Sequence, residues 1–352
     1  MNLDFPTTTT TRLVSATRGA IGLLLGLATL GAQAAPTYRI EAVPPVGGYW
    51  PSTTAAINNL GQVVGVASYG SQYFCFVYAD GVTHILLDSA GVTCTDINDQ
   101  GTVVGYTMGF NQTAYVWPHW SSARSDLPGM ATARRINNQG QIAGSYTIDW
   151  IMGAPAVYSH GEITKLDTLS GFGGGEATSI DENGKVVGYA TAPSTFDHAV
   201  SWTLGHRIKD LGTLGGRQSR ALALSSAGHI VGDSDLADGS IASFIVKGRS
   251  GMQQLPDSDN PNKTLHALGV NAKGDVVGYL TGQQDKWFAT LTRKGKTHKL
   301  LDLAEAASGS KWWNLHTARD INDAGQIVGA GSYRGDFSRG AYIATPIETA
   351  EP

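Results

Sequence analysis

The sequence has 352 residues, of which only 15% are charged, and its formal net charge is −4. Lysine and arginine form no basic stripe, which argues against nucleic acid as a partner. The 45 glycines suit short strands joined by many tight turns, because glycine adopts positive φ without strain.

The first 35 residues have the pattern of a secretory signal peptide. Arg12 and Arg18 precede an apolar stretch at residues 20–31 that is too short to span a bilayer. Ala32 and Ala34 then give the small-x-small pattern of a cleavage site. We expect residues 1–35 to be removed and the mature protein to be secreted or periplasmic, with a membrane anchor as the alternative. No second apolar run follows, so no membrane span is expected after cleavage.

The sequence contains two cysteines, Cys75 and Cys94. An even number in an exported chain favours one disulfide, since free thiols are a liability in an oxidising compartment. The alternative, a thiol nucleophile or metal ligand, lacks partner residues at metal-binding spacing. We therefore expect a disulfide between Cys75 and Cys94.

A nonapeptide of the form Ile-Asn-x-x-Gly-x-Val-Val-Gly recurs seven times along the chain. The spacings between successive copies are 40, 39, 44, 44, 46 and 51 residues. A period near this length with strand-rich units is typical of a β-propeller. The copies begin at Ile57, Ile97, Ile136, Ile180, Leu224, Val270 and Ile321.

The unit around Ile180 shows how one repeat predicts one blade. Its first turn, Asp181–Gly184, contains the Asn-Gly pair that is the strongest short hairpin signal. Four short antiparallel strands within about 40–45 residues make one propeller blade. The expected strands lie at residues 177–180, 185–190, 198–203 and 207–211.

The last unit lacks its fourth strand, since its third strand at residues 340–345 is followed by only a short tail. A matching strand at residues 38–43 precedes the first nonapeptide. We therefore predict an all-β fold, a single seven-bladed β-propeller at residues 36–346 whose N-terminal strand completes the last blade. A spiral solenoid would need polar capping repeats, which are not visible. Residues 347–352 are expected to form a disordered tail.

The invariant positions of the nonapeptide have structural explanations. The final glycine of each copy, such as Gly188, stands in a strand pattern and predicts a bulge or close backbone approach. The residue three positions before the isoleucine is always small, as seven strands crowding one axis require. The asparagine can bond its own backbone and hold the turn, and Asp181 or Ser225 can replace it.

At these residues the chain resembles the HAF family of bacterial extracellular repeat proteins. The resemblance covers residues 38–345 and includes LGTLGG at 211–216 and HAVSW at 198–202. It implies propeller-like repeats and an extracellular location, but it supplies no catalytic residues. Family members often end in a hydrophobic sorting tail, and no such tail follows here.

Function is expected in the variable loops on one face, because the nonapeptide hairpins on the other face are short and uniform. These loops carry aromatic residues, which suit stacking on sugar rings or anchoring a protein partner. The alternative is that they pack the loops together. The candidate ligand-binding residues are Trp50, Trp150, Trp312, Trp313 and Tyr333.

Three titratable residues interrupt a column of threonines near the start of the innermost strands. Glu176, Arg220 and His266 stand there in successive units, near the expected mouth of the central channel. As catalytic residues they suit a polysaccharide hydrolase or lyase, with Glu176 or His266 in acid–base roles. The alternative is an interblade salt bridge between Glu176 and Arg220 with His266 solvated, because ion pairs often resemble sites.

No metal or cofactor motif is recognisable, and we expect no cofactor. A calcium site stays open at Asp235–Gly239 or Asp257–Asn260, with ordinary solvated turns as the simpler interpretation. The sequence thus predicts an exported, monomeric binding module for a carbohydrate or for an envelope or extracellular protein. An enzyme at the channel mouth and a structural matrix protein are the alternatives.

Overall fold

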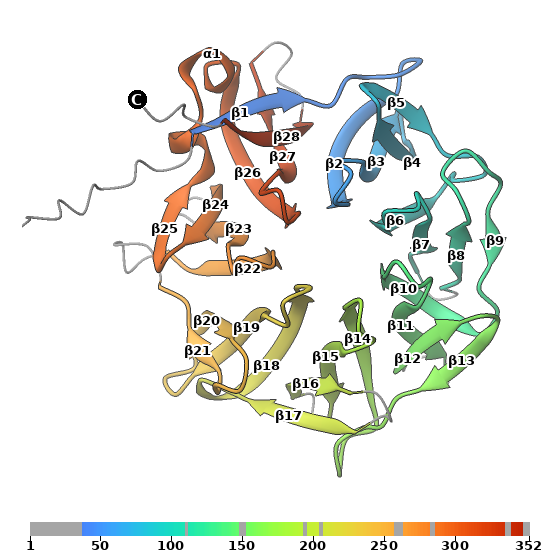
Figure 1. The fold of residues 1–352 in the computed structure, drawn as a ribbon, viewed down its shortest axis with the longest axis vertical. Coiled ribbons are helices and arrows are strands. Elements are labelled where there is room, and N and C mark those ends of the chain that lie inside the picture. The colour runs from blue at the N-terminus through green and yellow to red at the C-terminus, as the bar shows by residue number, and fades with distance from the viewer. Residues whose placement is uncertain are drawn as a thin grey trace, which may run out of the picture. The chain divides into compact units, whose positions relative to one another are not determined.

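The strands form seven four-stranded antiparallel sheets in the described part of the chain. Figure 1 shows these sheets as blades around a central opening, and the innermost strand of each blade is the one that leads into the nonapeptide. The predicted seven-bladed β-propeller is confirmed. The computed structural model describes residues 37–109, 112–147, 153–192, 196–203, 207–256, 263–281, 286–334 and 339–347.

The predicted signal peptide and residues 348–352 lie outside the described residues. Ile347 still belongs to the last strand, one residue beyond the end expected for the propeller. Among the described residues, no helix is long and apolar enough to cross a membrane.

The blades are numbered in the order of their nonapeptides. Blade 1 contains β2 (Trp50–Ile57), β3 (Val63–Tyr69), β4 (Gln72–Ala79) and β5 (Val82–Ile85). Blade 2 contains β6 (Val92–Ile97), β7 (Val103–Thr107), β8 (Ala114–Trp117) and β9 (Ser125–Asp126). Blade 3 contains β10 (Met130–Ile136), β11 (Ile142–Thr147), β12 (Gly153–Ser159) and β13 (Glu162–Lys165). Blade 4 contains β14 (Gly174–Ile180), β15 (Val186–Thr191), β16 (Asp197–Trp202) and β17 (Ile208–Gly212).

The remaining blades follow the same order, except that the last one is completed by the N-terminal strand. Blade 5 contains β18 (Gly215–Leu224), β19 (Ile230–Leu236), β20 (Ile241–Val246) and β21 (Gln253–Gln254). Blade 6 contains β22 (Leu265–Val270), β23 (Val276–Thr281), β24 (Trp287–Arg293) and β25 (Lys296–Lys299). Blade 7 contains β26 (Trp312–Ile321), β27 (Ile327–Tyr333), β28 (Arg339–Ile347) and β1 (Thr37–Ala42).

Pairing of β1 with β28 closes the ring, as predicted. The outer edge of β1 is covered by the segment that carries the 3-10 helix η2 (Leu300–Leu303) and the short helix α1 (Ala306–Gly309). The Glu305 amide donates to the Tyr38 carbonyl at 2.8 Å, and the Ile40 amide donates to Ser308 Oγ at 3.0 Å. A covered edge is protected from pairing with another chain.

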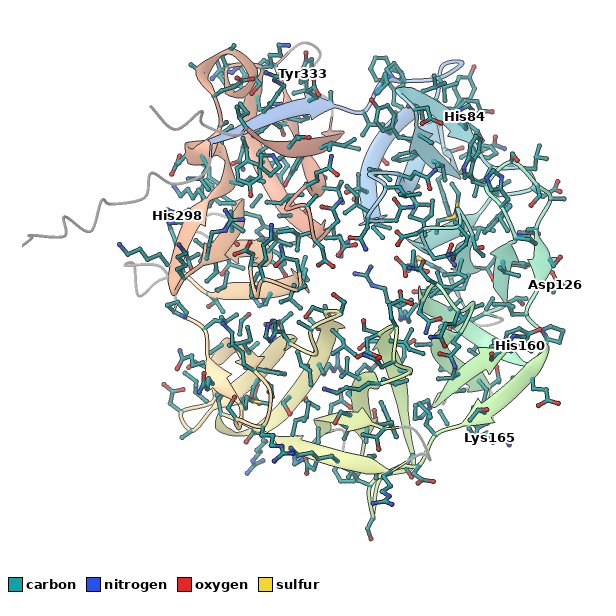
Figure 2. All side chains as sticks on the ribbon, in the orientation of Figure 1. His84, Asp126, His160, Lys165, His298 and Tyr333 are labelled. Atoms are coloured by element: carbon teal, nitrogen blue, oxygen red, sulfur yellow. A yellow bond between two sulfur atoms is a disulfide. The ribbon has the colours of Figure 1, made fainter. Side chains whose placement is uncertain are left out.

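The hydrophobic core is divided among the contacts between neighbouring blades. The cluster between blades 1 and 2 contains Val77 and Trp117, both fully buried. Within it a disulfide joins Cys75 of β4 to Cys94 of β6 (Figure 2), as expected from the cysteine count. The bond therefore fastens two blades to each other rather than closing a loop within one blade.

The final glycine of each nonapeptide marks a close backbone approach, as predicted. A Cβ atom at Gly188 would collide with the Glu176 carbonyl, and one at Gly278 would collide with the His266 carbonyl. The other five glycines of this column meet the equivalent carbonyl in the same way. A shift in strand register follows each of these two sites, at Ala177/Ser179 and Ala267/Gly269.

The repeat asparagine holds its own turn and also joins neighbouring blades. Oδ1 of Asn98 accepts hydrogen bonds from the amides of Gln100 and Thr102, as predicted. Its Nδ2 donates to the Asn137 carbonyl of the next blade at 3.1 Å, a contact that the sequence analysis missed. The same amide-to-carbonyl bond runs from Asn58 to Asn98, Asn137 to Asp181, Asn271 to Asn322 and Asn322 to Asn58.

Exchanging the two residue types tests this interblade bond. Asn98→Asp keeps the turn acceptor but removes the Nδ2 donor, so we expect it to lower the free energy of unfolding by about 1–2 kcal/mol. Asp181→Asn adds the missing donor toward blade 5 and is expected to raise it by about 1 kcal/mol. Equilibrium urea unfolding measures both, and changes of the same sign in the two variants would contradict the assignment.

Candidate functional site

The innermost strands bring Glu176, Arg220 and His266 to the same level of blades 4, 5 and 6, in β14, β18 and β22. Each lies opposite a residue of the second strand of its own sheet, as the register shows. These opposite residues are Tyr189, Asp233 and Tyr279. The three candidate catalytic side chains nevertheless bind different partners.

The Glu176 carboxylate is buried and is held from the side of blade 3. Its Oε1 accepts hydrogen bonds from Thr132 Oγ1 and Arg134 Nε, both at 2.8 Å, and its Oε2 accepts one from the Tyr189 hydroxyl at 3.3 Å. Arg134 Nη1 also donates to the Tyr106 hydroxyl at 2.6 Å. The alternative prediction of a salt bridge between Glu176 and Arg220 is therefore wrong, because the Glu176 carboxylate pairs with Arg134.

Arg220 is paired with the buried carboxylate of Asp197 in its neighbouring blade. Its guanidinium lies 4.8 Å from the centroid of the Tyr189 ring. Arg220 thus pairs with Asp197 instead of Glu176, and Tyr189 contacts both Arg220 and Glu176.

His266 is half-buried rather than solvated, which corrects the second part of that alternative. Its Nδ1 lies 3.0 Å from Asp233 Oδ2. Its ring stacks on Tyr279 with centroids 4.8 Å apart, and Tyr279 stacks on Trp287 at 5.0 Å. The three candidate catalytic residues therefore do not converge on one site: Glu176 and Arg220 share only the contact with Tyr189, and His266 pairs with Asp233.

The central channel opens on the face of the nonapeptide hairpins as a cavity of about 140 Å³. Its lining includes the half-exposed carboxylates of Asp99 and Asp323 and three residues that the sequence analysis did not single out. These three are Asp96, Arg135 and Asp320. They occupy the position just before the isoleucine of the repeat, where residue type varies from copy to copy.

Arg135 of blade 3 links two carboxylates in this part of the channel. Its Nη1 lies 3.0 Å from Asp96 Oδ1 and 3.0 Å from Asp320 Oδ2, and its Nη2 lies 3.1 Å from Asp320 Oδ1. The carboxylates also accept the amides of Ile136 and Ile57 from the blades that follow them. The triplet therefore ties blades 2, 3 and 7 together across the axis.

Burial raises the pKa of Asp96 to about 6, since desolvation outweighs the attraction of Arg135 and Asp320 adds repulsion. The folded pKa then exceeds the ordinary value of 3.8. The folded state therefore binds this proton more tightly than the unfolded state, and ionisation of Asp96 removes stability as the pH rises from about 4 to about 6.

Asp96→Asn is expected to remove this contribution. The wild type should lose stability relative to the variant as the pH rises through this window, because only the wild type acquires the buried charge. Thermal unfolding of both proteins at pH 4, 5, 6 and 7 measures the difference. Parallel curves for the two proteins across these pH values would show that Asp96 does not titrate as proposed.

Three exposed tryptophans lie on consecutive blades at the strand ends opposite the nonapeptide hairpins, a side here called the loop face. Trp287 begins β24 in blade 6, Trp313 follows the first residue of β26 in blade 7, and Trp50 begins β2 in blade 1. Their exposed fractions are 45%, 54% and 51%. Trp50 and Trp313 were candidates from the sequence, whereas Trp287 was not singled out.

Trp312 is buried in blade 7, with 1% of its surface exposed, so its prediction as a ligand-binding residue is wrong. Its ring contacts Tyr333 and Tyr342 edge-on, at centroid distances of 5.2 and 5.8 Å. Tyr333 is half-buried by this contact, and Figure 2 shows it toward the outer edge of the propeller. The candidate Trp150 lies outside the described residues.

Polar groups surround the exposed tryptophans at the junction of blades 6 and 7. Asn314 Nδ2 donates to the Trp287 carbonyl at 2.7 Å. The Arg334 guanidinium lies 4.3 Å from the Trp313 ring and donates to the Trp312 carbonyl. Trp287 and Trp313 are thus held on neighbouring segments of one surface.

No group of three or more histidine, cysteine, aspartate or glutamate side chains in the described residues is arranged to hold a metal ion. The calcium candidate Asp235–Gly239 forms a turn in which Asp238 accepts the amide and the hydroxyl of Ser240. The candidate at 257–260 lies outside the described residues.

Solved structures similar to this chain share its fold at low sequence identity. The β-propeller domain of the Trilobed protease from Pyrococcus furiosus is 10% identical, with a TM-score of 0.54 over 86% of this chain and 94% of that domain. That domain is described as having an open velcro topology, whereas β1 closes the ring here.

Two peptidases give similar scores. A prolyl endopeptidase is 10% identical with a TM-score of 0.56, and a puromycin-hydrolyzing peptidase from Mycobacterium tuberculosis is 11% identical with a TM-score of 0.54. Each match covers 89% of this chain, which spans only 51% and 52% of the two peptidase chains. These similarities show the fold alone. No family model and no curated protein matches the chain, so the resemblance to the HAF family stays a prediction.

Proposed function

We propose that this propeller is an exported binding module that holds a carbohydrate on its loop face, across blades 6, 7 and 1. The observation that supports this function best is the placement of Trp287, Trp313 and Trp50 on three consecutive blades. Each indole leaves about half of its surface in water, and exposed apolar surface gathered on one side of a protein marks an interaction site.

An indole face suits a sugar, because the C–H groups on one side of a pyranose ring form a flat apolar surface while its hydroxyls need hydrogen-bond partners nearby. Arg334 lies over Trp313 and restricts the orientation of that ring before a ligand arrives. Asn314 and Arg334 are polar side chains beside the two indoles. The leader pattern at residues 1–35 supports export to a compartment where polysaccharides are found.

The ion pairs of the candidate catalytic residues support a binding function rather than catalysis. Glu176 and Arg220 are committed to ion pairs within the propeller, so neither is an unpaired acid, base or electrophile. The carbohydrate surface lies at the strand ends of blades 6, 7 and 1, and needs none of these charges to change.

A glycan array compares the wild type with Trp287→Ala, Trp313→Ala, Trp50→Ala and the triple variant. Each single variant is expected to weaken binding of a captured glycan about tenfold, and the triple variant to abolish it, since one aromatic stack contributes about 0.5–1.5 kcal/mol beyond its buried area. Leu60→Ala, an exposed apolar residue on the hairpin face, is the control.

Unchanged glycan affinity in the triple variant would exclude this surface. Capture of an extracellular protein by these tryptophans, with no glycan bound, would keep the surface but overturn the class of ligand.

A further inference from the structure

The tripeptide Thr-Ala-Arg occurs in two innermost strands, at residues 132–134 of β10 and 317–319 of β26. Both alanines lie opposite the final glycine of their nonapeptide, Ala133 against Gly144 and Ala318 against Gly329. A shift in register falls directly after each alanine. The two tripeptides therefore occupy equivalent positions, and their surroundings can be compared residue by residue.

In blade 3 the tripeptide holds a carboxylate of the protein. Thr132 Oγ1 and Arg134 Nε both donate to Glu176 Oε1, and Glu176 comes from the innermost strand of the next blade. The guanidinium of Arg134 also lies over the ring of Tyr106 in the preceding blade, 4.8 Å from its centroid. The carboxylate thus accepts from donors of blades 3 and 4, while Tyr106 of blade 2 accepts a hydrogen bond from the arginine.

In blade 7 the equivalent threonine and arginine are Thr317 and Arg319, but the equivalent carboxylate is replaced by a hydroxyl. The Tyr189 hydroxyl has no equivalent, since Val66 lies opposite Thr53. Tyr279 of the preceding blade takes the place of Tyr106, and both lie directly after the final glycine of their repeats. The next blade offers Thr53 where blade 4 offers Glu176, since both lie one residue before the position paired with that glycine. Arg319 lies close enough to Tyr279 for its charge to oppose the rise in the tyrosine pKa that burial causes.

The side chains of Arg319 and Thr317 have no hydrogen-bond or ion-pair partner in the described part of the chain. The Arg319 side chain is exposed, and its guanidinium makes no hydrogen bond or ion pair there. The Thr317 hydroxyl makes none either, because the residue opposite it is Ala330, whereas Thr132 faces Ser145.

The carboxylates nearest to this place are bound elsewhere. Asp233, whose charge reaches Tyr279, accepts a hydrogen bond from Ser243 and faces Nδ1 of His266. Asp320 follows Arg319 in the chain, but its carboxylate is bound by Arg135 and by the Ile57 amide. Neither one completes the second tripeptide as Glu176 completes the first.

We propose that Thr317 and Arg319 bind the carboxylate of a ligand at the position that Glu176 fills in the other copy, with Tyr279 near Arg319 as Tyr106 is near Arg134. Tyr279 stacks on the exposed Trp287, so this site adjoins the surface proposed for carbohydrate. The ligand is therefore an acidic saccharide whose hexuronate carboxylate pairs with Arg319, an assignment that rests on the proposed function. A planar guanidinium is the side chain best suited to a carboxylate.

Titration calorimetry with an oligoglucuronate and the matching neutral oligoglucose tests the site. The wild type is expected to bind the oligoglucuronate at least about tenfold more tightly, as a charge-assisted pair requires. Thr53→Glu supplies the missing carboxylate from within the protein and is expected to remove this preference. Arg319→Gln should remove it as well, and Arg319→Lys, which keeps the charge without the fork, should reduce it. Arg249→Gln, an exposed arginine in a turn of blade 5, is the matched control.

Equal preference for the acidic oligosaccharide in the wild type, Thr53→Glu and Arg319→Gln, all shown to be folded by circular dichroism, would overturn the carboxylate site. So would equal affinity of the wild type for both oligosaccharides. In either case the triple tryptophan variant still reports on the proposed function, because it is expected to lose both ligands. Retention of both ligands by that variant would show instead that the carbohydrate surface is wrong.

Discussion

The blades of this ring are joined by the hydrogen bonds of the side-chain amide of the repeat asparagine. Its oxygen closes the turn of its own hairpin, and its nitrogen holds the carbonyl of the next hairpin, so one side chain satisfies donors and acceptors that would otherwise lie buried at the axis. Five such bonds between neighbouring blades fix the height of each innermost strand relative to the next. Asp181 and Ser225 preserve the turn but cannot donate from an amide, which leaves blade 5 fastened by other contacts.

Once the innermost strands are fixed at one height, a repeat position becomes a ring of side chains around the channel. Most members of such a ring are small or paired, because an unpaired charge near the axis would be costly. The pairs reach between blades: Arg134 to Glu176, Arg220 to Asp197, and Arg135 to both Asp96 and Asp320. Within such rings, the informative member is the one whose donors have no hydrogen-bond or ion-pair partner among the described residues, as is the case for Arg319.

The fold was predictable from the sequence because the same blade pattern recurs in seven repeats. The period, the Asn-Gly turn chemistry and the strand displaced to residues 38–43 together predict the number of blades and their closure. The role of the final glycine of each nonapeptide was equally predictable, since a residue without Cβ in every copy indicates a close backbone contact. The cysteine count and the expectation of export were enough to predict the disulfide.

The candidate site was less predictable because side chains reach across blade boundaries that the repeat does not describe. Arg134 and Arg220 both flank Glu176 in the column pattern, and only the structure shows which one reaches the carboxylate. Trp312 and Trp313 are neighbours in one strand, and because successive side chains point to opposite faces, one ring lies in the core and the other in water. Trp287 has no periodic signal at all.

A Thr-Ala-Arg segment of this ring is proposed to bind a carboxylate, and Glu176 supplies that carboxylate in one of the two copies. Glu176→Thr removes it and leaves Thr132 and Arg134 facing a hydroxyl, as Thr317 and Arg319 face Thr53. Thermal unfolding of this variant and the wild type in acetate, against chloride at equal ionic strength, tests whether the vacated position binds a carboxylate. A larger rise in Tm with acetate for Glu176→Thr than for the wild type is predicted; the same response of both proteins to acetate would contradict it.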